Sequence, residues 1–319
     1  MTTRPTRSRR TTLAVPGSSR KMIDKARDLA ADALFLDLED ACAPAAKAEG
    51  RKTIAAALNE GGFGTKTRTV RVNDWTTPWT YADVIEVVGN AGDNLDCLML
   101  PKTRGATDVA ALDLLLTQVE KSEGLEVGRI GLEIQIETSQ GLLALESIAT
   151  ASPRIETIVF GPADFMASIQ MKTLVVGEQP PGYDVGDAYH HILMSILMVA
   201  RANELQAIDG PYLAIKDLDG LRRVAQRSAA LGFDGKWALH PGQIEALNEI
   251  YSPRQHDYDH AENILDAYTW HTSQAGGHRG AAMLGEEMID EASRKMALVV
   301  SAKGRAAGMS RTDVWQAPA

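Results

Sequence analysis

The 319-residue sequence has little that several common protein classes require. Its two cysteines, Cys42 and Cys97, are too few for a disulfide framework, and their apolar or strand-end surroundings predict buried, reduced thiols. Aromatic residues make up 5% of the chain and the net charge is -9, which disfavours a nucleic-acid partner. The apolar run 192–200 is too short to cross a bilayer. We therefore expect a cytoplasmic globular protein.

The first ten residues are unusually basic, with four arginines. This stretch lacks the apolar core of a secretory signal. One interpretation is a targeting or phosphate-binding arm. The interpretation that we favour is a frayed, solvated terminus, because chain ends are commonly held loosely.

Apolar runs of strand length alternate with helical patterns over about 240 residues. We expect strands at 11–15, 33–37, 69–72, 97–100, 131–136, 155–160, 205–208 and 235–239. We expect helices at 21–31, 47–58, 81–88, 106–121, 141–149, 188–203, 218–231 and 243–250. Eight strands alternating with eight helices predict an α/β fold of the (β/α)8 TIM-barrel type. An open doubly wound sheet is the competitor, but no Gly-x-Gly-x-x-Gly follows the first strand.

The pattern changes near residue 252, so we expect a barrel domain at 1–252 and a C-terminal helical extension at 253–319. Helices are expected there at 256–272 and 286–302, on either side of a Gly-rich break. Within the barrel, the long segment 174–187 is read as a lid or interface, with a disordered insertion as the alternative.

Polar residues follow nearly every expected strand, and in a barrel these ends converge on one face. They are Pro16 to Ser18, Asp37, Glu39, Asp40, Arg71, Asn73, Asp74, Lys102, Glu137, Thr138, Gly161 to Asp164, Asp209 and His240. A single one is more often a cap or turn residue. The whole set together on one face of a barrel is typical of an active site.

Carboxylates outnumber cations among these residues. Because no cysteine or paired histidine accompanies them, oxygen ligands for Mg²⁺, with Mn²⁺ as the alternative, are favoured over a zinc site. Glu137 and Asp164 are the best pair by position, since they end consecutive strands. The alternative is that one of them pairs with Arg71 or Lys102. The planar fork of Arg71 also suits bidentate capture of a carboxylate.

The turn after the first expected strand offers a second kind of binding site. It contains Ser18 and Arg20 and leads into a helix that carries Lys25. Backbone donors and two cations at a helix start suit a phosphate. A simple N-capped helix would look much the same, so the pattern alone is weak.

Several motifs occur in order along the chain: Val15-Pro16-Gly17-Ser18, Leu36-Asp37-Leu38-Glu39-Asp40, Arg71-Val72-Asn73, Leu100-Pro101-Lys102, Ile136-Glu137-Thr138, Phe160-Gly161-Pro162-Ala163-Asp164-Phe165, Ile208-Asp209-Gly210-Pro211, the stretch from Gly232 to Pro241, and Met288-Ile289-Asp290-Glu291-Ala292. None is specific alone. Together they resemble the HpcH/HpaI aldolase and citrate lyase beta subunit-like family of CoA-ester lyases. Within that family, the sequence looks most similar to the malyl-CoA and citramalyl-CoA lyases.

The resemblance implies roles for particular residues. Glu137 and Asp164 would hold Mg²⁺, and Arg71 would bind the carboxylate of a 2-oxo acid. Asp290 would supply an acid/base group to a neighbouring subunit of a homotrimer or homohexamer, and the C-terminal extension that carries it would be a lid or an oligomerisation region. Residues that would help to hold the CoA ester or substrate are Ser18, Arg20, Lys25, Gly161, Pro162, Ala163, Leu239 and His240. The carboxylates Asp37, Glu39 and Asp40 would orient metal-bound water and pair with cations such as Arg71 or Lys102, with Asp40 counted among the catalytic residues.

The implied reaction is reversible cleavage of a 3-hydroxyacyl-CoA into acetyl-CoA or propionyl-CoA and glyoxylate or pyruvate. The partners would be small molecules, with no nucleic acid and no membrane. Three alternatives stay open. They are a malyl-CoA thioesterase or malate synthase-like enzyme on the same site, a noncatalytic acyl-carrier-binding subunit, and an aldolase that forms a Schiff base at Lys102.

Overall fold

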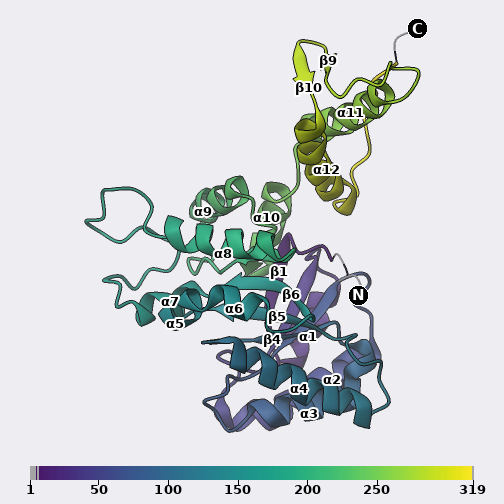
Figure 1. Ribbon diagram of the computed structural model, residues 1–319. Coiled ribbons are helices and arrows are strands. Elements are labelled where there is room, and N and C mark those ends of the chain that lie inside the picture. The colour runs from purple at the N-terminus through teal and green to yellow at the C-terminus, as the bar shows by residue number, and fades with distance from the viewer. Residues whose placement is uncertain (1–4, 6, 318–319) are drawn as a thin grey trace. The chain divides into compact units, whose positions relative to one another are not determined.

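The computed structural model, which describes residue 5 and residues 7–317, contains a closed eight-stranded barrel (Figure 1). Each strand is parallel to the next, and β8 closes the barrel against β1. The strands are β1 (Thr11–Pro16), β2 (Ala33–Asp37), β3 (Thr67–Arg71), β4 (Cys97–Leu100), β5 (Gly131–Ile136), β6 (Ile155–Phe160), β7 (Gln206–Asp209) and β8 (Gly235–Ala238). The expected (β/α)8 fold is confirmed.

Helices follow the strands along the chain. They are α1 (Arg20–Arg27), α2 (Lys47–Glu60), α3 (Thr80–Ala91), α4 (Ala106–Ser122), α5 (Ser139–Leu143), α6 (Leu145–Ala149), α7 (Pro162–Ser168), α8 (His190–Ala202), α9 (Leu218–Leu231) and α10 (Ile244–Ile250). Short 3-10 turns lie at Pro44–Ala46, Gly92–Asn94 and Pro241–Gln243. Two expectations were wrong. The helix expected at 141–149 is two short helices that meet at Ala144, and α7, which begins with a proline, was not expected.

Strand residues alternate between two apolar cores. One core packs the outward apolar side chains of the strands against the helices. The other fills the barrel interior with Phe35, Met99, Val159, Ile208 and Trp237. Because this inner core plugs the barrel, polar side chains at the strand ends lie over an apolar floor.

The expectation of a solvated N-terminus was wrong for residues 7–10, which include three of the four arginines. The fourth arginine of that stretch lies outside the described residues. The Arg9 side chain is 1% exposed and donates to Glu133 Oε1 at 2.8 Å and to Glu156 Oε2 at 2.6 Å. It also donates to Gln206 Oε1 at 2.5 Å. These partners lie at the beginnings of β5, β6 and β7. Arg9 therefore ties three strands together at the end of the barrel opposite the strand carboxyl ends.

Replacing Arg9 by Met is expected to destabilise the fold by about 3–5 kcal/mol, because Glu133 and Glu156 would remain buried without their cation. The measurement is the free energy of unfolding in urea. Arg222→Met is the control, since it removes only the exposed pair of Arg222 with Glu249. If both variants lost the same small amount of unfolding free energy, Arg9 would not hold the strands together.

A second compact unit, Ser252–Ala319, follows the barrel unit Met1–Tyr251. It contains α11 (Gln255–Thr272), the hairpin of β9 (Ala282–Leu284) and β10 (Glu287–Ile289), and α12 (Glu291–Ala306). The expected all-helical pattern was therefore wrong, since a hairpin occupies the start of the expected helix 286–302. Its small core combines residues of both helices with one hairpin residue: Ala261, Ile264, Ala267, Ile289 and Ala297.

Three further observations bear on the expectations. Cys42 and Cys97 are buried and unbonded, as expected. No helix among the described residues is long and apolar enough to cross a membrane. The segment 174–187 contains no helix or strand, and it is tied to α9 by an ion pair of 2.7 Å between Asp187 and Arg227.

Candidate active site

Arg71 and Asp37 are neighbours across the carboxyl ends of β3 and β2. Arg71 Nε and Nη2 donate to the two carboxylate oxygens of Asp37 at 2.8 and 2.6 Å, and Nη1 lies 3.1 Å from Glu39 Oε2. The guanidinium carbon also lies 5.5 Å from the ring centres of Phe35 and Trp237. The sequence suggested that this fork was free for a ligand, but Asp37 occupies it. A ligand carboxylate would meet only the remaining N–H groups of Arg71.

The loop after β2 carries Glu39 and Asp40, and both pair with cations as expected. The Lys102 ammonium donates to Glu39 Oε1 and to Asp40 Oδ1, the latter at 3.3 Å. Burial raises the pKa of Glu39 in spite of Arg71 and Lys102. The pKa of Asp40 is lowered, because hydrogen bonding with Glu39 and the charges of Lys102 and Arg71 outweigh its partial burial. Glu39 therefore bridges the two cations of the site.

Glu137 follows β5 and is 2% exposed. Its Oε1 accepts from the Lys102 backbone N–H at 2.6 Å, and its Oε2 accepts from Gln135 Nε2 at 2.5 Å. Lys102 adopts a left-handed backbone, with φ of 49°, at this contact. Burial, together with repulsion from Asp164 and Glu39, raises the pKa of Glu137 to about 8 despite the charge of Arg71. Glu137 is thus a buried carboxylate whose charge is not fully compensated.

The surroundings of Glu137 fit a hard divalent cation. Asp164, half-buried on α7, is close enough to Glu137 to perturb its pKa, and neither forms an ion pair within the described residues. The alternative that one of them pairs with Arg71 or Lys102 is therefore wrong. The Oε1 of Gln135 is buried and has no hydrogen-bond partner. Two carboxylates beside an unpaired amide oxygen are donors that suit Mg²⁺ or Mn²⁺.

Gly161 lets the chain pass close to Glu137. A Cβ atom at this position would lie 2.5 Å from Glu137 Oε2 and 2.6 Å from Glu137 Cβ, so any larger residue would displace the carboxylate. Pro162 and Ala163 follow as the first residues of α7. No cluster of three or more His, Cys, Asp or Glu arranged for a metal occurs in the part of the chain that the structure describes. A cation here would therefore complete its coordination with water and ligand oxygens.

The raised pKa of Glu137 predicts how the stability of the metal-free protein depends on pH. Between its ordinary pKa of 4.5 and about 8, the unfolded chain loses the Glu137 proton while the folded chain keeps it. The free energy of unfolding therefore falls as the pH rises through this interval. Above pH 8 the folded protein bears the full destabilisation from the ionised Glu137. Glu137→Gln removes the titration, so we expect the variant to be more stable than wild type at pH 8.5 and nearly equal to it at pH 5.

The measurement is urea unfolding of both proteins in EDTA at several pH values. Mg²⁺ should restore the wild type at high pH and leave the variant unchanged. A stability difference that does not vary with pH would contradict the burial of an uncompensated carboxylate at Glu137.

The residues expected to hold the CoA ester lie after β1 and β8, which are adjacent in the barrel. Leu239 and His240 follow β8, and both are exposed. The Nδ1 atom of His240 accepts from the Gly242 backbone N–H at 3.0 Å. Ser18 and Lys25 are exposed at the start and in the last turn of the α1 region. The positions are thus accessible from neighbouring strand ends.

The Arg20 guanidinium is less available to bind a phosphate than the sequence suggested. Its Nε lies 2.9 Å from Asp24 Oδ1, and its Nη1 donates to Glu60 Oε1 at 2.9 Å. Two carboxylates therefore neutralise this cation. A phosphate would have to replace these exposed contacts, which are individually weak.

Asp290 lies in the second unit and caps the N-terminus of α12. Its Oδ1 accepts from the backbone N–H groups of Ala292 and Ser293 at 2.9 and 3.0 Å, and Ser293 completes a capping box. These bonds, chiefly those from Ser293, lower the pKa of Asp290. In this arrangement the carboxylate is ionised but weakly basic.

Gln135 was not among the expected site residues. A signal for it is present in the sequence, because Glu133, Gln135 and Glu137 alternate with Leu132, Ile134 and Ile136 along β5. In a barrel strand that alternation places the three polar side chains inside and the apolar ones against the helices.

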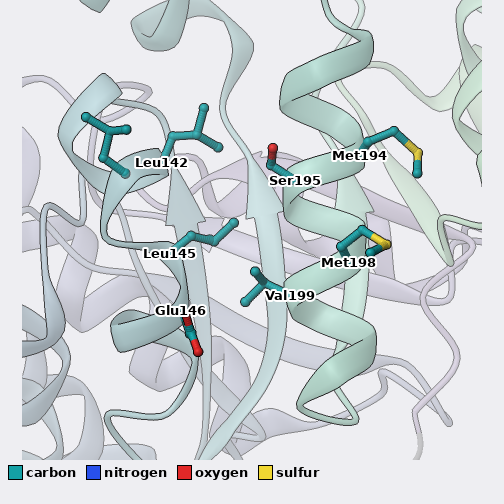
Figure 2. A pocket seen from close by; sticks show the side chains of 8 residues that line it. Leu142, Leu145, Glu146, Met194, Ser195, Met198 and Val199 are labelled. Carbon is teal, nitrogen blue, oxygen red and sulfur yellow. The ribbon is translucent and has the colours of Figure 1, made fainter.

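A separate hollow on the barrel unit lies between α5, α6 and α8 (Figure 2). It is lined mainly by apolar side chains of these helices: Leu142, Leu143, Leu145, Met194, Met198 and Val199, together with Glu146 and Ser195. Its one ionisable residue is Glu146. The hollow therefore lacks the converging charges of the strand-end site.

Residues 10–241 match the family model described as HpcH/HpaI aldolase/citrate lyase. The chain belongs to the HpcH/HpaI aldolase/citrate lyase family. It is 37% identical over 304 residues to the L-malyl-CoA/beta-methylmalyl-CoA lyase of Cereibacter sphaeroides, covering 93% of this chain and 94% of that protein. It is 32% identical over 301 residues to the malyl-CoA/beta-methylmalyl-CoA/citramalyl-CoA lyase of Chloroflexus aurantiacus, covering 90% and 84% of the two chains.

Solved structures share the fold of this chain. The protein CitE of Mycobacterium tuberculosis, in complex with magnesium, acetoacetate and coenzyme A, is 25% identical with a TM-score of 0.71, covering 95% of this chain and 99% of that one. A citrate lyase of Burkholderia xenovorans has a TM-score of 0.81 at 20% identity, covering 94% and 93% of the two chains, and shows the fold alone. The fold of the HpcH/HpaI aldolase/citrate lyase family thus extends over nearly the whole chain.

Proposed function

We propose that this chain is a Mg²⁺-dependent carbon–carbon lyase acting on a CoA thioester. The substrate would be malyl-CoA, beta-methylmalyl-CoA or citramalyl-CoA, cleaved reversibly to acetyl-CoA or propionyl-CoA and glyoxylate or pyruvate. The observation that carries the proposal is the uncompensated pair of Glu137 and Asp164 beside Arg71 and Lys102, in a chain similar along its length to malyl-CoA lyases.

Glu137 and Asp164 would hold the cation, and Gln135 Oε1 would take part directly or through water. Bound there, Mg²⁺ would supply Lewis-acid chemistry at the carbonyl oxygen of the 2-oxo acid. The remaining N–H groups of Arg71 would neutralise the carboxylate of that acid. Lys102 and Asp40 would orient water at the edge of the site. Aromatic rings beneath Arg71 exclude water from its other face.

Asp290 would move the proton at the acyl carbon. In the condensation direction it takes a proton from the methyl group of acetyl-CoA, and in cleavage it returns that proton to the leaving acyl carbon. Its pKa is lowered in the single chain, so entry into a water-excluding site would have to raise its basicity. That requirement is consistent with a carboxylate delivered by a second subunit.

The oligomer proposed for this role is a homotrimer or homohexamer with shared active sites. In support, the small second unit exposes several large apolar side chains, which are Met283, Met288, Met296, Leu298 and Val299. Exposed apolar groups at this density are typical of interaction surfaces. Light scattering should give a mass that is a multiple of three chains of 34.4 kDa.

The substrate claim is tested by incubating the purified protein and Mg²⁺ separately with malyl-CoA, beta-methylmalyl-CoA and citramalyl-CoA. Release of glyoxylate or pyruvate, with an equal amount of acyl-CoA, is expected for at least one ester. The absence of oxo-acid release from all three would overturn the proposal. Borohydride trapping with substrate should leave Lys102 unmodified, because its ammonium is engaged by Glu39 and Asp40.

A thioesterase is the second candidate. The chain is 35% identical over 259 residues to the (3S)-malyl-CoA thioesterase of Cereibacter sphaeroides, covering 81% of this chain and 82% of that protein. The same incubation separates the two reactions. A thioesterase would release free CoA and malate from malyl-CoA without forming glyoxylate.

A further inference from the structure

A buried lysine lies directly beneath the loop that carries Glu39 and Asp40. Lys47, the first residue of α2, is 4% exposed, and its Nζ donates to Leu38 O at 2.7 Å, Glu39 O at 3.0 Å and Asn73 Oδ1 at 2.6 Å. Its Nζ also lies 4.8 Å from the ring centre of Trp79. An ammonium has three N–H donors, so every donor of Lys47 has an acceptor. Two of those acceptors are main-chain carbonyls of the acidic loop.

Asn73, two residues beyond β3, extends this contact. Its Nδ2 donates to Leu38 O at 3.0 Å and to Asp83 Oδ2 at 2.6 Å, and its backbone N–H donates to the same Asp83 oxygen at 2.9 Å. Asp83, on α3, is fully buried. The Leu38 carbonyl thus receives donors from both Lys47 and Asn73, and α3 fixes the orientation of the Asn73 amide.

The backbone N–H of the same residue, Leu38, is tied to the active-site strand. The Leu38 backbone N–H donates to the carbonyl oxygen of Arg71 at 3.0 Å. One residue later, the Glu39 side chain lies between Arg71 and Lys102. The network therefore fixes the backbone from which the Glu39 and Asp40 side chains project.

We propose that Lys47, Asn73 and Asp83 are positioning residues that hold the Leu38–Glu39 backbone, and so set where Glu39 and Asp40 meet Arg71 and Lys102. The proposal rests on the proposed lyase function. None of the three residues needs to touch the substrate. Small displacements of groups that orient a reacting centre can lower turnover about a hundredfold without removing any catalytic group.

The placement argues against a role in stability alone. A buried cation is costly, and well-packed apolar residues often stabilise such a position equally well. Lys47 has no carboxylate among its three acceptors, so it gains no direct ion pair in return. Its bonds instead converge on two consecutive residues of the acidic loop, and fully bonded buried networks of this kind rigidify what they hold.

The test is Lys47→Met, which keeps most of the unbranched side chain and removes its donors. In the malyl-CoA cleavage assay we expect kcat to fall about 10- to 100-fold with KM changed less than about threefold. Arg154→Met is the matched control, because Arg154 is a buried cation paired with Asp113 and Glu120, and it lies just before β6, at the end of the barrel opposite the strand carboxyl ends. It should lose stability while kcat per folded enzyme stays within about threefold of wild type.

A double-mutant cycle identifies the route of the effect. If Lys47 acts through Glu39, Lys47→Met should have little further effect on kcat in a Glu39→Gln background. If the effects of the two substitutions on kcat were fully additive, the proposal would be overturned. It would also be overturned if the wild type were active and the Lys47→Met variant kept the wild-type kcat. An inactive wild type would instead overturn the lyase proposal. If Lys47→Met does not fold, Asn73→Ala takes its place with the same expected outcomes.

Discussion

Replacement of Asp164 by Asn is expected to lower the kcat of malyl-CoA cleavage by about a thousandfold or more. The substitution keeps the size of the side chain and removes one of two carboxylates proposed to hold the cation. A bound metal that polarises a carbonyl contributes several kcal/mol to transition-state stabilisation, and each 1.4 kcal/mol is about tenfold in rate. Mn²⁺ binding, followed by electron paramagnetic resonance, should weaken in parallel.

The control for this prediction is Glu146→Gln. Glu146 is a carboxylate on α6 that lines the outer hollow and lies outside the strand-end site (Figure 2). It should leave both kcat and Mn²⁺ affinity near the wild-type values. If Asp164→Asn kept wild-type turnover and metal affinity, the assigned cation site would be wrong.

Asp290→Asn is expected to lower kcat by about a thousandfold while Mn²⁺ affinity stays unchanged, because positioned acid–base groups contribute about 10² to 10⁴ in rate. Asparagine caps a helix as well as aspartate does, so α12 should keep its N-terminus. The loss would then reflect the carboxylate itself. The measurement combines steady-state kinetics with Mn²⁺ titration and thermal unfolding.

Ser293→Ala provides the matched control, since it breaks the capping box and leaves the Asp290 carboxylate in place. It should lower thermal stability slightly and leave kcat within about threefold of wild type. An active Asp290→Asn enzyme would remove the assigned role of Asp290. A Ser293→Ala enzyme as impaired as Asp290→Asn would show that the cap, and not the acid, matters.

The barrel could be predicted from sequence because its signals are local. Strands such as β5 and β6 are short segments of recurring apolar residues bounded by turn residues, and both begin and end where the sequence predicts. The strand order then follows from parallel, consecutive pairing. The candidate acids Glu137 and Asp164 could be found in the same way, since Glu137 comes directly after β5 and Asp164 lies in the first turn of the helix that follows β6.

Contacts between distant residues could not be predicted. Arg9 bonds to Glu133 and Glu156, each more than 120 positions away, so a basic terminus looked solvated. The fork of Arg71 suits any carboxylate, and only the register of β2 and β3 places Asp37 against it. Lys47 looked like an ordinary helix residue, because two of its three acceptors are backbone carbonyls, which carry no sequence signal, and the third is the amide of the distant Asn73.

The hairpin in the second unit was missed for a different reason. Each of its strands has three residues, which is too short for an alternating pattern to be distinguished from a helix. The one available signal is Gly285, which has φ of 62° in the two-residue turn between the strands. Glycine at the first position of such a turn is typical of a hairpin.

The most direct test of the account is the product balance of the wild-type enzyme. Purified protein is incubated with malyl-CoA and Mg²⁺, and glyoxylate, acetyl-CoA, malate and free CoA are quantified over time by liquid chromatography. The account predicts equal amounts of glyoxylate and acetyl-CoA, abolished by EDTA and restored by Mg²⁺. Malate and free CoA without glyoxylate, or turnover that persists in EDTA, would contradict it.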